Sequence, residues 1–381
     1  MIGCKSLTVK VVVAVFLCQM ALPLGAWAQS VPGKEYNGIS MPDSINTDGT
    51  AKKKKNLFVK ARDLLVNYLD YYDFDTAYIS PSKFYYTLML QQSASFENYI
   101  IRNTGERPQM LHFAPQHSHK IGVYFGWHSF FLGLSANTDE LFAKRKASNK
   151  KTEYYLNMYG YKLGADFFYR STGNDFNIKR LDGFQLGGQD YNFKGESFAG
   201  LKVKTMGLNL YYVFNNKHFS YPAAYAQTTV QKISRGTLVG GISWLRHHVD
   251  FDYTRLPLEI KRELDDNMKF NNIKYTDINI NFGYAFNWVF ADNWLLAVAL
   301  TPALAYKVSR IDQESAAYDR KHHSLNLDFI TRTSLTYNNN RFFAGANTVS
   351  HVYQYYRKDF ALTDNFGRIN VYVGFNFGRR K

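Results

Sequence analysis

The chain is poor in cysteine, in proline and in long apolar runs. Its 381 residues include two cysteines, Cys4 and Cys18, and nine prolines. No segment after residue 28 approaches the roughly 20 consecutive apolar residues that a membrane-spanning helix needs, and the mean hydropathy of -0.34 agrees with that. These absences argue against a helical membrane protein. They also leave the chain beyond residue 28 without thiols that can mispair in an oxidising compartment.

The first 28 residues hold both cysteines and have the layout of a secretory signal peptide. Lys5 and Lys10 supply a basic start, residues 11–20 are apolar, and residues 26–28 read Ala-Trp-Ala, an A-x-A cleavage site. We therefore predict that the protein is exported and that residues 1–28 are removed.

The formal net charge is +15, a surplus that can attract nucleic acid. Export removes nucleic acid from consideration, so anionic lipid head groups or acidic glycans are the better partners for this charge. Residues 29–55 include the run Lys52-Lys53-Lys54-Lys55 and lack periodicity, which is typical of a flexible leader.

Residues 57–72 place apolar side chains at three- and four-residue spacing, which predicts an amphipathic helix of about four turns. Three placements are open for this helix. It can lie on the periplasmic leaflet, pack into a barrel mouth as a plug, or cap the periplasmic end of a barrel.

Aromatic residues are abundant, at 17% of the chain, and they alternate with polar or small ones. The stretch 274–288 puts Ile278, Ile280 and Phe282 on one face of a strand and Asn279 and Asn281 on the other. In a soluble sheet the apolar face points into a core. In a membrane barrel it points outward into lipid, and the polar face points into the lumen.

Period-two alternation recurs along the chain, in stretches that are longer than typical soluble strands. From residue 253 onward, long connections alternate with short ones, as in outer-membrane barrels. The same rule makes 138–152 and 215–230 periplasmic turns. We predict an all-β, antiparallel transmembrane β-barrel of about 12 strands (10 to 14) with an N-terminal amphipathic helix. The predicted strands are 84–102, 110–114, 119–126, 129–137, 153–171, 197–214, 231–252, 274–290, 294–310, 322–337, 341–357 and 367–378.

The chain thus divides into four parts. These are a signal peptide (1–28), a flexible leader (29–55), a periplasmic helix with an extended segment (56–81) and an outer-membrane β-barrel (82–381).

Two short runs carry a family resemblance. Asp75-Thr76-Ala77-Tyr78-Ile79 with Pro81, and Lys120-Ile121-Gly122-Val123-Tyr124-Phe125-Gly126-Trp127, resemble domain-of-unknown-function family 4421. The resemblance covers most of residues 56–381 and implies an exported outer-membrane β-barrel of Bacteroidota-type bacteria. It implies no activity, ligand or catalytic residue. The residues that match the motif are Asp75, Thr76, Tyr78, Ile79, Gly122, Tyr124 and Gly126.

Adjacent His-His and Ser-His pairs in the predicted strands do not have the geometry of a metal site or a catalytic pair. Adjacent residues of a strand point to opposite faces, so they can neither chelate a metal together nor form a nucleophile and base pair. We accordingly predict no metal and no cofactor. The pairs in question are His247-His248, His322-His323 and Ser350-His351.

The polar faces of the predicted strands supply a set of lumen-lining candidates. We expect solute passage or binding, or an envelope structural role. The alternative is an outer-membrane lipid-modifying hydrolase of the lipase or deacylase type. The expected partners are outer-membrane lipids, a small polar or amphiphilic ligand and, during insertion, the barrel-assembly machinery. The lumen candidates are Asp277, Asn279, Asn281, Asn326, Asp328, Arg332, Asn347, Arg368, Asn370 and Asn376.

Overall fold

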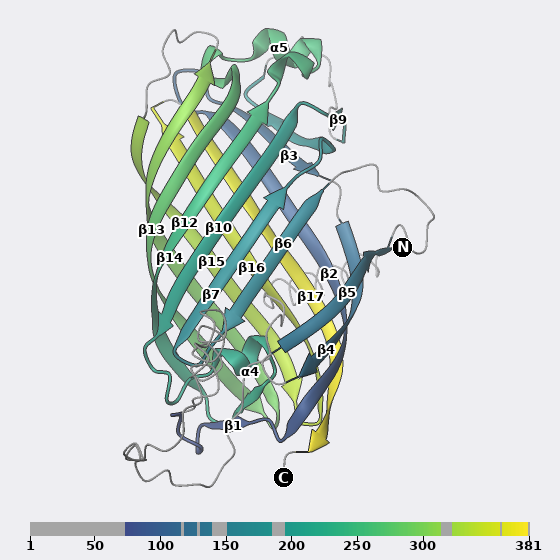
Figure 1. Ribbon diagram of the computed structural model, residues 1–381. Helices are drawn as coiled ribbons and strands as arrows, with labels where there is room; N and C mark the ends of the chain where they lie inside the picture. Colours follow the sequence, from purple (N-terminus) through teal and green to yellow (C-terminus); the bar gives the residue numbers. More distant parts are fainter. Residues whose placement is uncertain are drawn as a thin grey trace, which may run out of the picture.

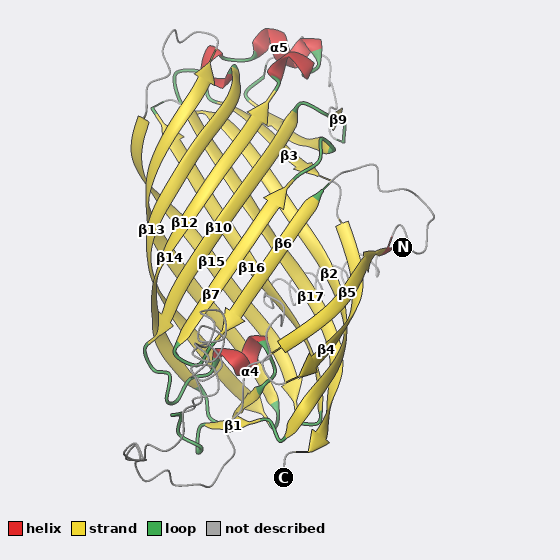
Figure 2. Ribbon diagram, viewed as in Figure 1, coloured by secondary structure: helices red, strands yellow, loops and turns green. Residues whose placement is uncertain are grey.

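The computed structural model shows a tall barrel of tilted antiparallel strands with short helical segments at both ends (Figures 1 and 2). It describes residues 73–115, 118–127, 130–138, 151–184, 195–313, 322–358 and 360–379. The predicted signal peptide, leader and amphipathic helix lie outside these residues. In the described part of the chain, no helix has the length and apolar character needed to cross a bilayer.

Fifteen strands form one antiparallel sheet, and β2 (Phe84–Asn103) is the strand at which it divides. One end of β2 pairs with β3 (Gln109–Pro115), which continues to β8 (Phe176–Asp182) and β9 (Ser197–Phe198). The other end pairs with β4 (Ser118–Trp127), which continues to β5 (Phe130–Asn137). In order, the strands that lead up to β2 are β6 (Thr152–Tyr159), β7 (Leu163–Ser171), β10 (Leu201–Val213), β12 (Arg235–Phe251), β13 (Phe270–Ala291), β14 (Trp294–Gln313), β15 (His322–Asn338), β16 (Phe342–Arg357) and β17 (Phe360–Arg379).

The two ends of the barrel differ in their connections. At one end, here termed the loop side, β12 and β13 are joined through η1 (Tyr253–Arg255), α5 (Leu258–Glu263) and η2 (Asp266–Met268) (Figure 1). At the other end, the turn side, β13 meets β14 in a tight turn in which Asn293 takes φ 65°. Asparagine tolerates this left-handed conformation better than most residues, which suits it to a tight hairpin.

The turn side also carries α4 (Tyr221–Tyr225) and a separate two-stranded sheet of β1 (Ile79–Pro81) and β11 (Thr229–Gln231). The connection 215–230, predicted as a turn, therefore lies on the turn side. Its length is explained by α4, which lies at the turn-side end of the barrel (Figure 2), and by β11, which pairs with β1.

The outer wall is apolar and exposed. Along β13, Ile278, Ile280 and Phe282 are 60%, 68% and 55% exposed, while the alternating residues Asn279 and Asn281 are buried. Exposed large apolar side chains continue along most of the strands, which is incompatible with a water-facing surface of this size. The predicted fold class is confirmed, because the chain forms an antiparallel β-barrel whose apolar wall faces lipid.

The prediction of a single strand over 153–171 was wrong. The segment is the hairpin β6–β7, which turns at Gly160; a Cβ there would lie 2.3 Å from the carbonyl oxygen of Leu163. Conversely, 110–114 and 119–126 are two halves, β3 and β4, of one interrupted span beside β2. With β3 and β4 counted together and the short β8 and β9 set aside, twelve spans form the wall.

The orientation predicted for 138–152 was wrong as a consequence. The pairing makes β5 run toward the loop side and β6 run away from it, so the connection joins two strands at their loop-side ends. When 153–171 is split into two strands, successive wall strands again alternate in direction along the chain. The short strand β8 was not predicted.

We expect Ile280→Arg to lower the free energy of unfolding by about 2–4 kcal/mol, because it puts a charge at the middle of the lipid-facing wall. Phe290→Arg is the control. It lies on the same face of β13 at its turn-side end, where Phe290 is 45% exposed, and we expect a cost of about 0–1 kcal/mol. Urea unfolding in lipid vesicles, followed by tryptophan fluorescence, measures both; equal costs would contradict a lipid-facing β13.

Candidate functional site

The lumen is filled in three layers along the barrel axis. An apolar layer closes the loop side, a layer of ion pairs occupies the middle, and α4 with its surrounding residues closes the turn side. The candidate site is therefore an interior packed with side chains, and its chemistry depends on which of them are charged.

The loop-side layer is an aromatic core. Phe113 stacks on Phe198 at 4.9 Å between ring centroids, and Phe251 and Phe270 follow at 5.0 Å. Ile260 of α5 is fully buried against the same cluster. This helix thus covers the barrel end and contributes to its core, so water entering from the loop side meets an apolar barrier.

The turn-side layer is built on α4, which hydrogen bonds fix inside the barrel mouth. Asn287 Nδ2 donates to the Ser220 carbonyl at 2.9 Å, and Ser334 Oγ donates to the Ala224 carbonyl at 2.7 Å. Gln227 Nε2 donates to Tyr372 Oη at 2.8 Å. Because these contacts come from several wall strands, the segment is held from different sides as a plug.

The family-motif residues near the N-terminal end of the described chain belong to the segment Asp73–Ser82, termed here the strap, which lies beside this plug. Asp75 Oδ1 accepts from the Ala77 N–H at 2.8 Å, and the Thr76 carbonyl accepts from Lys232 Nζ at 2.8 Å. Tyr78 Oη accepts from Arg235 Nη2 at 2.7 Å, and Ile79 is buried. The other three motif residues, Gly122, Tyr124 and Gly126, alternate on the inward face of β4.

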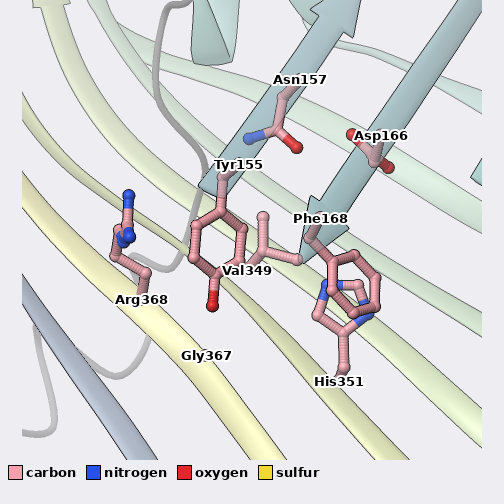
Figure 3. A pocket seen from close by; sticks show the side chains of 8 residues that line it. All are labelled: Tyr155, Asn157, Asp166, Phe168, Val349, His351, Gly367 and Arg368. Carbon is pink, nitrogen blue, oxygen red and sulfur yellow. The ribbon is translucent and has the colours of Figure 1, made fainter. Parts of the chain in front are cut away.

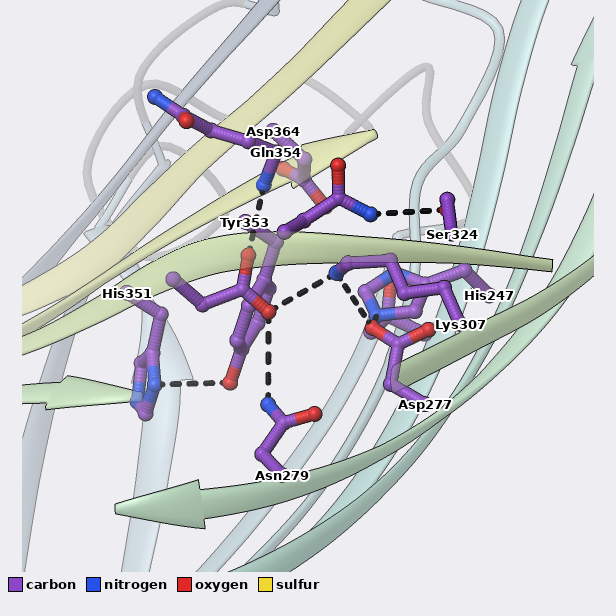
Figure 4. A network of polar contacts seen from close by, with 12 residues as sticks. His247, Asp277, Asn279, Lys307, Ser324, His351, Tyr353, Gln354 and Asp364 are labelled. Carbon is purple, nitrogen blue, oxygen red and sulfur yellow. Dashed lines mark hydrogen bonds and ion pairs between the residues drawn. The ribbon is translucent and has the colours of Figure 1, made fainter. Parts of the chain in front are cut away.

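A lysine between two carboxylates forms the centre of the polar layer (Figure 4). Lys307 Nζ donates to Asp277 Oδ2 at 2.7 Å and to Asp328 Oδ2 at 2.8 Å, and none of the three side chains is exposed. Asn279 and the Gln354 backbone N–H donate to the Asp328 carboxylate at 3.4 Å and 2.9 Å. These hydrogen bonds offset the cost of burying three charges, which is large for unpaired groups.

Two arginines reach across the lumen. Arg170 of β7 donates to Asp364 of β17 at 2.6 Å, lies 3.6 Å from Glu97 of β2, and stacks on the Phe366 ring at 3.7 Å. Arg332 of β15 pairs with Asp166 of β7. Since β7 lies near one end of the strand order and these partners lie far along it, the pairs connect facing walls.

A third cluster surrounds Glu153 of β6. Its carboxylate lies 3.1 Å from Lys151 Nζ, 3.6 Å from Arg368 Nη2 and 3.8 Å from Lys120 Nζ, and it accepts from Ser95 Oγ at 3.1 Å. Except for Lys151, these partners belong to strands on the far side of the sheet order. The cluster therefore brings β6 close to β2, β4 and β17.

Small cavities remain between these clusters. One, of about 20 Å³, lies between β6, β7, β16 and β17 (Figure 3). A second, of about 10 Å³, is bounded by Asn209, Asn281 and Arg332 among others. The rings of Tyr155, Phe168 and His351 and the guanidinium of Arg368 line the first. Ion-paired residues contribute to both linings, Asp166 and Arg368 to the first and Arg332 to the second.

All ten predicted lumen residues point inward, with only Arg368 retaining a side-chain exposure of 14%. Asp277, Asp328, Arg332 and Arg368 belong to the ion-pair clusters. Among the amides, Asn370 donates to Asn347 at 2.9 Å, Asn281 to Ser243 at 2.5 Å, and Asn376 accepts from Thr87 at 2.7 Å. Asn326 accepts from the Tyr356 backbone at 3.2 Å. That they serve a ligand stays a prediction.

The sequence prediction omitted several residues of the ion-pair layer. Lys307 lies on the inward face of 294–310 among alanines, where a lone lysine in a small-residue row is a recognisable signal. Arg170 and Asp166 were not predicted to face the lumen, because 153–171 was predicted as one strand. Glu97, Glu153 and Asp364 lie within or near predicted strands, but nothing local to them reveals partners that are distant in sequence.

The histidine pairs divide between the two faces of the wall, since His247 is buried in the lumen and His248 points outward. His247 lies 3.6 Å from Asp277 and 3.5 Å from Thr205 Oγ1, an acid–histidine–hydroxyl order that resembles a nucleophilic triad. All three are buried, and Thr205 also accepts from Arg170 at 3.3 Å, so no substrate reaches this hydroxyl. Within the described ranges, no cluster of three or more His, Cys, Asp or Glu residues is arranged to hold a metal ion.

A lipid-facing antiparallel wall around a charged, packed lumen defines a protein of the outer-membrane β-barrel class. The chain belongs to the DUF4421 family, a domain of unknown function, which matches residues 73–377. The resemblance seen in the two short motifs is thereby confirmed. No curated protein matches the chain.

Solved structures with some likeness are also outer-membrane proteins. The outer-membrane protease OmpT from Escherichia coli is 8% identical with TM-score 0.35, covering 78% of this chain and 98% of that one. The translocator domain of autotransporter NalP from Neisseria meningitidis is 9% identical with TM-score 0.29, covering 84% and 95%. OprG from Pseudomonas aeruginosa is 10% identical with TM-score 0.22, covering 78% and 98%. Likeness at this level assigns neither activity nor ligand.

We expect Lys307→Met to lower the free energy of unfolding by about 3–5 kcal/mol, because it leaves two buried carboxylates without their cation. Adding Asp277→Asn and Asp328→Asn to the same chain should recover most of the loss. Lys274→Met, on the exposed outer face, is the control and should cost less than about 0.5 kcal/mol. Equal effects of the buried and the exposed substitution in a denaturant titration would contradict the buried triad.

Proposed function

We propose that this protein is an occluded outer-membrane β-barrel, which serves the envelope by binding and structural support and does not act as an open diffusion pore. The observation that carries the proposal is the buried ion-pair layer, in which Arg170 and Arg332 link facing walls. A water-filled pore would leave such side chains exposed and paired with solvent.

The two capping layers support the same proposal. A solute that entered from the loop side would have to displace the aromatic core around Phe113 and Phe251. From the turn side it would meet α4, with Tyr221 and Tyr225 buried. The two cavities described above have room for about one water each among the ion pairs, which leaves little space inside the lumen for a small polar or amphiphilic ligand.

The route of export and the orientation of the barrel in the membrane follow from general rules for outer-membrane barrels. We propose export through the signal peptide 1–28, insertion by the barrel-assembly machinery, and residence in the outer membrane. Short turns of such barrels face the periplasm, so the turn side with the strap Asp73–Ser82 is proposed to face the periplasm. The loop side with α5 is proposed to face outward.

The hydrolase alternative rests on the order Thr205, His247, Asp277, and its burial weighs against it. An activated nucleophile has to meet its substrate, whereas this one faces the interior and contacts Arg170. Surface-accessible lipid hydrolysis by the purified protein, abolished by Thr205→Val, would favour this alternative.

We expect the purified protein to give no stepwise currents in planar bilayers, because the lumen is closed at both ends and crossed by ion pairs in the middle. A general-diffusion porin inserted in the same preparation provides the positive control. Correct folding is checked by heat-modifiable migration on a gel. Ohmic steps of porin size from folded protein would contradict the proposal and restore solute passage as the preferred function.

A further inference from the structure

Basic residues form a row on the outer wall near its loop side. Across four neighbouring strands, β10, β12, β13 and β14, the register pairs Lys204 with His248, His248 with Lys274, and Lys274 with Arg310. Residues paired directly across antiparallel strands point to the same face of the sheet. That face is the outer one, because Lys274 and Arg310 are exposed and the residues that alternate with them are buried.

The row belongs to a wider group, termed here the basic patch. Two residues along the strands, Lys202 lies on the loop side of the row and Arg246 on its turn side, both on the outer face. The register places two carboxylates, Asp250 and Asp312, in the row of Lys202 at the loop-side edge of this area. Asp250 contacts His248 at 2.8 Å. The basic patch consists of Lys202, Lys204, Arg246, His248, Lys274 and Arg310.

The basic patch directly adjoins the lipid-facing belt. The register places Leu208 beside Trp244, Trp244 beside Ile278, and Ile278 beside Tyr306, in a row four residues below the cationic one. These four side chains are between 37% and 60% exposed. Acyl chains that cover this apolar row therefore end at the depth where the cations begin.

Three cations of the patch, Lys204, Arg246 and Lys274, differ from the cations of the lumen in their surroundings. In the lumen, Lys307 and Arg170 are buried and matched by carboxylates. On the outer wall, within the described part of the chain, no carboxylate lies within 4 Å of Lys204, Arg246 or Lys274. Like charges gathered on one face of a sheet disfavour folding, so Lys204, Arg246 and Lys274 together favour binding of an external anion.

We propose that the basic patch binds the phosphate-bearing head group of an anionic lipid in the leaflet at the loop side. Neighbouring strands lie about 4.8 Å apart, so the long side chains of Lys204 and Lys274, which lie on either side of β12, can reach one phosphate together. Arg246 of β12 lies between them and can bind the phosphate through two N–H groups. The acyl chains then lie on the apolar row from Leu208 to Tyr306. This inference requires the membrane-spanning fold, and it holds whether or not the lumen conducts.

The test is a titration of folded protein in detergent with diphosphorylated lipid A, with bound lipid counted by native mass spectrometry. We expect the wild type to retain the lipid and the variant Lys204→Gln, Arg246→Gln, Lys274→Gln to bind it about 100-fold more weakly, since each cation near a lipid surface contributes about fivefold. The dephosphorylated lipid should bind the wild type as weakly as the phosphorylated one binds the variant.

The matched control neutralises the same number and kind of residues on the turn side, with Lys83→Gln, Lys217→Gln and Arg341→Gln, and should bind like the wild type. If the triple variant fails the heat-modifiable migration test, Lys274→Gln alone should show a several-fold loss. Equal retention by the wild type and the patch variant, equal retention of the dephosphorylated lipid, or no retention by the wild type would overturn the proposal. None of these results bears on conductance.

Discussion

Ion pairs that cross the lumen are the constraint on which the rest of the barrel depends. A wall of twelve spans encloses a space too wide for its own aliphatic side chains to fill. Arg170 and Arg332 span that space, and each ends on a carboxylate of a distant strand. Removing one partner would leave a buried charge, which costs more than the intact pair contributes. The pairs therefore fix which strands face each other.

Charge balance inside the lumen is close. In the described residues the ion-pair clusters contain six cations and six carboxylates. The cations are Lys120, Lys151, Arg170, Lys307, Arg332 and Arg368, and the carboxylates are Glu97, Glu153, Asp166, Asp277, Asp328 and Asp364. The net charge of +15 therefore resides elsewhere, and part of it lies in the basic patch on the outer wall. The same residue types thus serve as internal packing in one place and as an exposed surface in another.

Alternation predicted the wall well where strands are long and joined by clear turns. The stretch 274–290 shows which side chains meet lipid, because burial on one face only imposes a period of two. The hairpin at Gly160 was missed because aromatic residues continue on both sides of it, and one glycine is a weak signal in a strand. The pairing of Arg170 with Asp364 joins residues 194 positions apart, so only the folded, curved sheet reveals it.

The filled lumen is tested most directly by thiol accessibility. A chain that lacks residues 1–28 has no cysteine, so Ala303→Cys places a single thiol on the inward face of β14, where Ala303 is buried. In a second chain, Lys83→Cys places a single thiol at an exposed position on the turn-side rim and serves as the reference. A charged, water-soluble methanethiosulfonate reagent is applied to each folded protein in detergent. The account predicts rapid labelling at position 83 and none at position 303. Labelling of both at similar rates would show an open, water-filled lumen and contradict it.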